Sequence, residues 1–255
     1  ISQQAAENSL SSRASGIKYM KHQLAAIGLA PLWIPQALYV RWVTPRLSEP
    51  QGERSGTHGS GPVLRLMILG DSAAAGVGVS TQNQALSGQL VSALGSDFRV
   101  SWKLIAKTGH KAKDVLATLM MLAPEPFDFV VTSIGVNDVT HGTGTQKWMD
   151  QQARIVDLLQ SRFQSRHIIL SSVPPMHLFP ALPQPLRWYL GARAGQFNRA
   201  LRHFADGCEP CVFVSIDFPL ETAYMAADGF HPGAPAYALW AGHIADVIRS
   251  RIYTT

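Results

Sequence analysis

Short apolar runs and segments of helical period alternate along most of this chain. The apolar runs are typical of strands buried in a parallel sheet, and they are Val63–Leu69, Phe98–Ile105, Phe127–Ser133, His167–Val173 and Cys211–Ile216. The segments of helical period are Asn83–Leu94, Lys111–Leu122, Thr145–Phe163, Leu186–Phe204 and Pro235–Ile252. Strands that alternate with helices predict a parallel sheet covered by helices on both faces. We therefore expect a three-layer α/β/α fold with a doubly wound, flavodoxin-like sheet of about five parallel strands.

The residues before this pattern divide into three parts of different composition. Residues 1–19 are polar and without period, which predicts a leader segment. The segment His22–Val43 is apolar and holds no acidic residue. The segment Thr44–Pro62 is rich in Pro, Gly and Ser, which predicts a linker. We therefore expect an N-terminal region over residues 1–62 and one folded domain over residues 63–255.

The apolar segment His22–Val43 supports two interpretations. Pro31 and Pro35 interrupt it, so it is too broken for a transmembrane helix of about 20 apolar residues. It predicts either contact with a membrane surface, as an interfacial anchor or a signal-peptide-like segment, or an apolar arm packed on the domain. The prolines favour packing, because they break the helix that an anchor would use. The sequence favours a bacterial-type cytoplasmic or membrane-associated location, and it leaves secretion and the oligomeric state open.

The composition of the chain argues against several classes of function. Of the 255 residues, 46% are hydrophobic and 15% are charged, which is typical of a globular chain with a large core. The net charge is +5, but Lys and Arg are scattered and do not interleave with aromatic residues, so no nucleic-acid partner is expected. Cys208 and Cys211 have C-x-x-C spacing, but no second pair completes a zinc site and no helix opens after them. We expect a loop with two thiols or a local disulfide, no metal and no cofactor.

The stretch Leu64–Ser80, LRLMILGDSAAAGVGVS, ends an apolar run on Gly-Asp-Ser and continues with small residues that allow close approach. It is not a P-loop, because Val77 stands where the Lys belongs, nor a dinucleotide fingerprint, because Thr81 replaces the third Gly. It also departs from the nucleophile elbow G-x-S-x-G, because Ala74 replaces the last Gly. What remains is Ser72 at the carboxyl end of a strand, the edge at which open α/β sheets bind ligands.

Residues of catalytic type also follow other predicted strands. Gly109 lies in KTGHKA after the second strand, Asn137 in IGVNDV after the third, and Asp228 and His231 in DGFHPG after the last. The chain thus holds four blocks in order: Gly-Asp-Ser, a lone Gly, Gly-x-Asn-Asp and Asp-x-x-His. With these blocks it resembles the SGNH, or GDSL, family of serine esterases and lipases. Ala73 departs from the Leu of the family's nickname, at a position that varies.

The resemblance implies a role for each of these residues. Ser72 is the expected nucleophile, His231 the base that takes its proton, and Asp228 the carboxylate that holds the His231 tautomer. The backbone N–H groups of Ser72 and Gly109 and the side-chain amide of Asn137 form the expected oxyanion hole. The implied activity is hydrolysis of a small-molecule carboxylic ester through an acyl-enzyme, without a metal or cofactor.

Each residue taken alone also has a simpler interpretation. Ser72 can be a helix N-cap, Asp228 a turn residue and His231 a surface histidine, but four ordered blocks favour the enzyme. Asp71 is predicted to bond loop backbone and Asp138 to cap the following turn. The alternatives for the site are an acyltransferase, a carbohydrate O-deacetylase, or an inactive domain that binds carbohydrate or lipid.

Apolar residues on the loops beside the four blocks are typical of a wall for an acyl chain or an aromatic ester. These candidate substrate-binding residues are Val136, Val139, Pro174, Met176, Phe179 and Phe230. They predict short- to medium-chain acyl esters as substrates. Alternatively, the apolar loop that follows Pro174 packs under the arm of residues 22–43.

Overall fold

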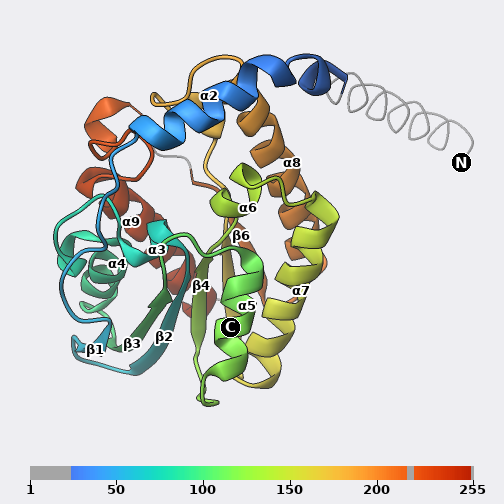
Figure 1. The fold of residues 1–255 in the computed structure, drawn as a ribbon. Helices are drawn as coiled ribbons and strands as arrows, with labels where there is room; N and C mark the ends of the chain where they lie inside the picture. Colours follow the sequence, from blue (N-terminus) through green and yellow to red (C-terminus); the bar gives the residue numbers. More distant parts are fainter. Residues whose placement is uncertain (1–23, 217–220, 254–255) are drawn as a thin grey trace, which may run out of the picture.

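A six-stranded sheet forms the centre of the computed structural model, which describes residues 24–216 and 221–253 (Figure 1). Its order is β1-β3-β2-β4-β5-β6. The strands are β1 (Ser55–His58), β2 (Val63–Gly70), β3 (Arg99–Ala106), β4 (Phe129–Ser133), β5 (His167–Ser171) and β6 (Cys211–Val214). The five strands from β2 to β6 are parallel, which confirms the predicted doubly wound sheet.

Strand β1 corrects the prediction that residues 44–62 are only a linker. It pairs antiparallel with β3, with Ser55 opposite Lys103 and His58 opposite Val100. All four residues of β1 are exposed and carry no apolar alternation. This segment is therefore a strand because it pairs with the open edge of β3, and not because it is buried. A search for apolar patterns in the sequence does not detect such a strand.

Helices cover both faces of the sheet, as the alternating pattern predicts (Figure 1). One face carries α5 (Ala112–Met121), α7 (Thr145–Ser161) and α8 (Leu186–Asp206), and the other carries α4 (Leu86–Leu94) and α9 (Ala234–Tyr253). Along β2, Met67 and Leu69 join the first core while Leu66 and Ile68 join the second, because side chains of a strand alternate between faces.

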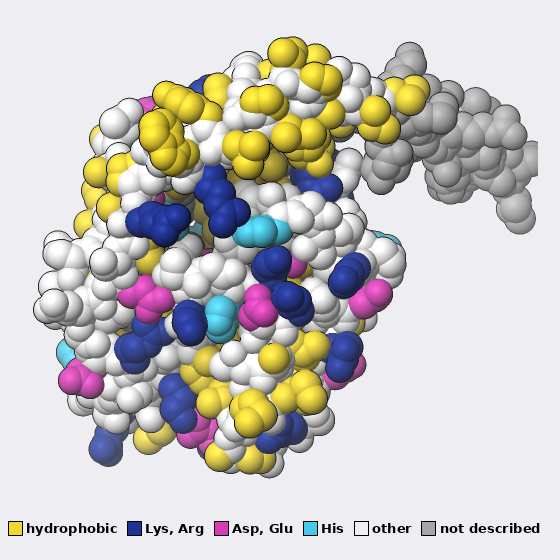
Figure 2. Space-filling model, in the orientation of Figure 1, with side chains coloured by type: hydrophobic (Ala, Val, Ile, Leu, Met, Phe, Trp, Pro, Cys, Tyr) yellow, Lys and Arg dark blue, Asp and Glu magenta, His cyan; other side chains and the backbone are white. Residues whose placement is uncertain are grey.

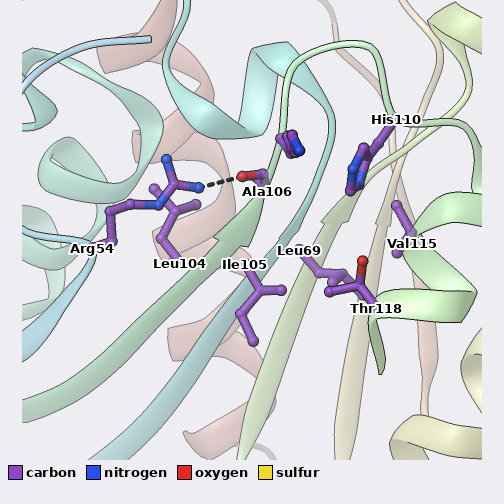
Figure 3. A pocket seen from close by; sticks show the side chains of 9 residues that line it. Arg54, Leu69, Leu104, Ile105, Ala106, His110, Val115 and Thr118 are labelled. Carbon is purple, nitrogen blue, oxygen red and sulfur yellow. Dashed lines mark hydrogen bonds between the residues drawn. The ribbon is translucent and has the colours of Figure 1, made fainter. Parts of the chain in front are cut away.

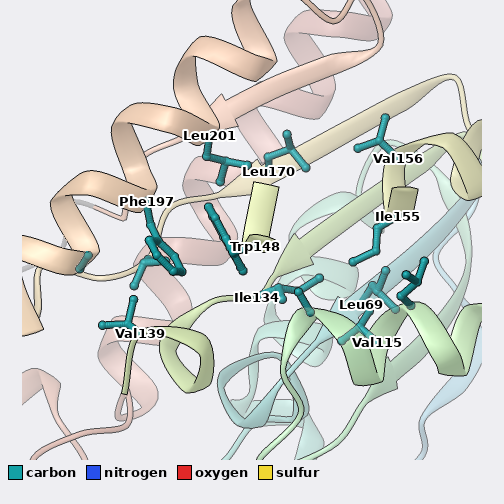
Figure 4. Packing of buried hydrophobic residues seen from close by; sticks show 14 of the residues in the cluster. Leu69, Val115, Ile134, Val139, Trp148, Ile155, Val156, Leu170, Phe197 and Leu201 are labelled. Carbon is teal, nitrogen blue, oxygen red and sulfur yellow. The ribbon is translucent and has the colours of Figure 1, made fainter. Parts of the chain in front are cut away.

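The core under α7 and α8 contains the largest buried side chains of the sheet's first face. Trp148 of α7 and Phe197 of α8 stack with ring centroids 4.3 Å apart, and both are fully buried (Figure 4). Aromatic stacking adds about 0.5–1.5 kcal/mol beyond the burial of apolar area. This contact fixes the spacing of α7 and α8 and so supports the loops at the carboxyl edge of the sheet.

Helix α2 (Ala30–Val43) crosses the molecule above the carboxyl ends of the strands (Figure 1). Trp33 stacks on Tyr189 of α8 with centroids 4.3 Å apart, and Val40 is buried in the core. Gln36 donates to Gln184 O at 2.6 Å and accepts from Leu186 N–H at 3.1 Å. The arm therefore packs on the start of α8, one of the two arrangements that its sequence allows.

The prolines do not interrupt α2, contrary to the prediction. Pro31 lies in the first turn, where the helix needs no donor, and Pro35 lies inside the helix. Contacts of Trp33, Gln36 and Val40 with the domain, on both sides of Pro35, hold the helix in place. Within the described residues, none of the helices is long and apolar enough to span a bilayer.

Candidate active site

Ser72 stands at the point where the central strand β2 ends. Gly70 closes the strand, and a Cβ there would lie 2.2 Å from Ser133 O of β4, so only glycine allows this approach. Asp71 caps the short helix α3 (Ser72–Ala75) by accepting from Ala73 N–H at 3.1 Å. Ser72 is the first residue of α3, where a backbone N–H has no acceptor within the helix. The turn thus presents both the hydroxyl and the N–H of Ser72 at the sheet edge.

Backbone hydrogen bonds hold the neighbouring loops against this turn. Asp71 N–H donates to Ser133 O at the end of β4, at 3.1 Å. Lys107 N–H, after the end of β3, donates to Gly70 O at 3.3 Å. The parallel strands β3, β2 and β4 therefore deliver three of the four sequence blocks to one place.

The fourth block brings His231 and Asp228 to Ser72. His231 Nε2 lies 2.9 Å from Ser72 Oγ, and His231 Nδ1 lies 2.6 Å from Asp228 Oδ2. The Asp228 side chain is only 1% exposed, whereas the imidazole of His231 is 24% exposed. Three side chains from two distant parts of the chain thus form one hydrogen-bonded row that ends at the surface.

The Asp228 carboxylate is held in its ionised form. Burial by itself raises its pKa, but hydrogen bonds from the His231 ring and from the backbone N–H groups of His231 and Phe230 lower the pKa below its usual value. The loop forms because Gly229 takes a φ of +65° and Ala226 N–H donates to His231 O at 2.8 Å. Asp228 therefore fixes both the backbone and the ring of His231.

The other two candidate oxyanion residues lie on segments that are bonded to each other. The amide Nδ2 of Asn137, in α6 (Val136–Thr140), donates to His110 O at 3.0 Å, so it is tied to the loop that carries Gly109. Gly109 has a φ of +85°, and a Cβ there would meet no described atom within 4 Å. Its left-handed backbone, rather than crowding by the protein, is the reason that this position favours glycine.

Two buried carboxyl groups beside the row have structural contacts. Burial raises the pKa of Asp71 to about 7, against the lowering effect of the Ala73 N–H. Asp138 is also buried and has a raised pKa; it accepts from Ala112 N–H at 2.9 Å, at the start of α5. Asp71 bonds loop backbone as predicted, and the Asp138 carboxyl bonds both the start of α5 and, as predicted, Thr143 in the turn that follows Asp138.

Glu49 and Arg54, which sequence reasoning missed, hold the loop that carries Gly109. Glu49 Oε1 accepts from the Thr108 N–H at 2.7 Å and from the Thr108 hydroxyl at 2.8 Å. Arg54 donates to Glu49 Oε2 at 3.0 Å and also to Ala106 O. Both residues lie in the segment predicted as a linker, and no motif marks them. The pairing of β1 with β3 and the bridge between Gln51 and Thr81 bring them to this loop.

Half of the predicted substrate wall belongs to the core instead. Val139, Met176 and Phe179 are buried in the cluster under α7 and α8, so they cannot line an open site. The loop that holds Met176 and Phe179 is apolar because it packs beneath α2 and α8, whereas Val139 belongs to α6. Val136, Pro174 and Phe230 are half-buried, and Phe230 lies edge-on to Phe179 with centroids 5.9 Å apart. Phe230 adjoins His231 in the chain, and the role of these three residues in a substrate wall stays a prediction.

A cavity of about 400 Å³ lies next to the loop that carries Gly109 (Figure 3). Leu69, Leu104, Ile105 and Val115 form its apolar part, and Arg54, Lys107, His110 and Thr118 its polar part, together with Ala106. Ser72, Asp228 and His231 are not among these lining residues. The cavity is thus a neighbour of the hydrogen-bonded row and not part of it.

The described residues offer no group of three or more His, Cys, Asp or Glu side chains that could hold a metal ion. Cys208 and Cys211 are free thiols, and burial beside Cys208 raises the pKa of Cys211. They lie where β6 begins, at the amino edge of the sheet and away from Ser72. This agrees with the predicted loop with two thiols.

The fold and these blocks place the chain in a family. A model of the GDSL-like lipase/acylhydrolase family matches residues 68–239, from within β2 into α9. The chain therefore belongs to this family of esterases, which confirms the resemblance seen in the four sequence blocks.

Individual relatives agree with this assignment. The chain is 29% identical over 237 residues to the GDSL-like esterase Rv1075c of Mycobacterium tuberculosis, covering 84% of this chain and 75% of the relative. The crystal structure of TesA shares the fold, with a TM-score of 0.59 at 21% identity, over 73% of this chain and 98% of TesA. Est24, a carbohydrate acetylesterase from Sinorhizobium meliloti, has a TM-score of 0.54 at 15% identity, over 73% of this chain and 99% of Est24.

Proposed function

We propose that this chain is a serine carboxylic ester hydrolase in which Ser72, His231 and Asp228 form a catalytic triad. The observation that carries the proposal is the row of hydrogen bonds from Ser72 Oγ through His231 to the buried Asp228. A serine hydroxyl is a weak nucleophile until a base takes its proton, and His231 Nε2 is within reach of that proton. The ionised Asp228 keeps Nδ1 protonated, so that Nε2 is free to accept.

The reaction follows from these positions. Ser72 Oγ attacks the ester carbonyl carbon while its proton passes to His231 Nε2. The tetrahedral oxyanion accepts hydrogen bonds from the N–H groups of Ser72 and Gly109 and from the Asn137 amide. Collapse expels the alcohol, which takes the proton from His231, and leaves the acyl group on Ser72. Water then attacks the acyl carbon while His231 takes its proton. The bond from that carbon to Ser72 Oγ breaks, Ser72 Oγ recovers the proton from His231, and the carboxylic acid departs.

The proposed substrates are esters of short- to medium-chain acids. The support is three half-buried apolar residues on the loops that follow the strands, Val136, Pro174 and Phe230, of which Phe230 adjoins His231 in the chain; apolar side chains suit an acyl chain better than a polar sugar. The similarity to a carbohydrate acetylesterase is a similarity of fold and does not indicate the substrate. An acetylated sugar is therefore included as a comparison substrate in the test below.

The test compares the wild type with Ser72→Ala on p-nitrophenyl acetate, butyrate and octanoate and on an acetylated sugar. We expect hydrolysis by the wild type and a loss of about 10³-fold or more in the variant, because no other group replaces the nucleophile. Ser80→Ala, in an exposed part of the following turn, is the matched control and keeps full activity. A fluorophosphonate that labels the wild type but not Ser72→Ala, read by mass spectrometry, locates the nucleophile independently of substrate.

Three outcomes contradict parts of this proposal. Equal turnover by the wild type and Ser72→Ala removes Ser72 as nucleophile. No turnover and no fluorophosphonate labelling leave a binding domain. A product in which an added alcohol is acylated faster than water indicates a transferase at the same site.

A further inference from the structure

The outer face of α2 exposes many large apolar side chains. Trp42 is 83% exposed, Ile27 in the preceding helical turn is 70% exposed, and Leu38 is 66% exposed. The same face continues with Leu24, Leu32, Ile34, Tyr39 and Val43, all of them exposed. Figure 2 shows a band of apolar side chains along the top of the molecule, where α2 lies. Contiguous apolar surface of this kind marks a site of interaction.

The opposite face of α2 already supplies what the fold needs. Trp33, Gln36 and Val40 form the stripe that packs on the domain, and they recur every three or four residues. A helix that is apolar all round is normally buried on every side or in contact with lipid. The outer face therefore has no role in packing among the described residues, and it calls for an occupant outside the chain.

The charge around α2 indicates the nature of that occupant. Residues 8–48 contain five Lys and Arg and no Asp or Glu, an excess equal to the whole net charge of +5. Arg41 and Arg46, at the end of α2 and just beyond it, are exposed beside Trp42. Apolar side chains with Trp and Tyr, flanked only by cations, complement an anionic lipid surface. A second copy of this chain carries the same positive net charge, so it offers no such attraction.

The outer face of α2 also lies at the same end of the molecule as the candidate active site. Gln36 bonds the loop before α8, and Phe179 of that loop packs on Phe230, the neighbour of His231. The helix crosses above the carboxyl ends of the strands, where Ser72 stands (Figure 1). A surface that contacts α2 therefore lies at the end of the molecule where Ser72 stands.

We propose that the outer face of α2 docks on the surface of an anionic lipid bilayer and brings Ser72 to amphiphilic esters held there. The helix lies in the interface rather than crossing it, with Trp42 and Leu38 among the acyl chains and Arg41 and Arg46 at the headgroups. The choice of ester rests on the proposed function, but the docking does not.

The experiment is co-sedimentation of the full chain with vesicles of phosphatidylcholine, alone or mixed with phosphatidylglycerol. The wild type sediments with the mixed vesicles, less with phosphatidylcholine alone, and less at high salt because screening weakens the attraction. The double variant L38E/W42E loses about tenfold or more in partitioning, because two apolar side chains that would enter the bilayer become charged. Met121→Glu is the matched control: Met121 is 87% exposed at the end of α5, at the opposite edge of the sheet, and its variant binds as the wild type does.

Activity separates this proposal from the proposed function. All three proteins hydrolyse soluble p-nitrophenyl acetate equally, whereas only L38E/W42E is slow on a long-chain ester dissolved in the mixed vesicles. A wild type that binds vesicles but hydrolyses nothing contradicts the proposed function and leaves the docking standing. Wild type that stays in the supernatant, or L38E/W42E that sediments fully, overturns the docking. A dimer that dissociates in L38E/W42E without lipid binding assigns the face to a second copy of the chain.

Discussion

Asp228 accepts three N–H hydrogen bonds from the backbone and ring of its own loop, and its lowered pKa keeps it ionised near neutral pH. Asp228→Asn keeps the size of the side chain but removes the charge and favours the wrong His231 tautomer. We expect kcat/KM for p-nitrophenyl butyrate to fall about 10³–10⁴-fold. Asp150→Asn, on the exposed side of α7, serves as control. Full activity in Asp228→Asn rules out its role in orienting His231.

Asp71 gives a prediction about stability rather than activity. Its pKa is about 7 in the folded protein, raised mainly by burial, whereas an unfolded Asp titrates near about 4. Between these values the folded chain binds the extra proton, so the free energy of unfolding decreases as pH rises from about 4 to about 7. In Asp71→Asn, which keeps the acceptor for Ala73 N–H, this decrease is absent.

Urea unfolding of the wild type and Asp71→Asn across this pH range measures the effect. The difference in unfolding free energy, variant minus wild type, grows in favour of the variant as pH rises and becomes constant above about 7. Two curves that stay parallel across the range show that Asp71 is already ionised in the folded protein.

At the scale of elements, the segment before β1 positions the loop that carries Gly109. Glu49 accepts two hydrogen bonds from Thr108, and hydrogen bonds from Thr108 and Arg54 outweigh burial to lower its pKa, so it is ionised at neutral pH. Glu49→Ala frees the loop, and we expect kcat to fall about tenfold with little change in KM, because misplacement of a donor weakens transition-state binding.

Two further variants distinguish positioning from a general loss of stability. Glu49→Gln keeps an acceptor for Thr108 and recovers most of the lost kcat. Glu53→Ala, exposed in the same segment, behaves as the wild type. If Glu49→Ala changes only the melting temperature, Glu49 is a purely structural residue.

At the scale of the whole molecule, the side chains and backbone of the chain supply every group that the proposed reaction needs. Every proton moves through His231, and the oxyanion is stabilised by N–H donors, so no step calls for a Lewis acid. We expect dialysis against EDTA to leave kcat/KM unchanged. An activity that EDTA removes and zinc or calcium restores contradicts this mechanism.

The five parallel strands and their helices could be predicted because a strand buried on both faces is a continuous apolar run, which is visible locally. The candidate site could be predicted in part for a related reason. Each block follows a strand, and parallel strands bring their carboxyl ends to one edge, so Ser72 meets His231 although they are 159 positions apart. The edge strand β1 could not be predicted, because its exposed residues depend on the free edge of β3 and not on their own pattern.

The sequence by itself determined the order of elements, the type of sheet and the residues able to carry ester chemistry, since these depend on neighbours along the chain. Tertiary structure alone decided properties that depend on neighbours in space. Packing under α8 buried Val139, Met176 and Phe179, which as apolar residues beside the sequence blocks could equally have lined a site. Pairing at the sheet edge brought Glu49 to Thr108. Packing on α8 covered one side of α2 and left the other exposed, a division that is not encoded by a helix with apolar residues on all its sides.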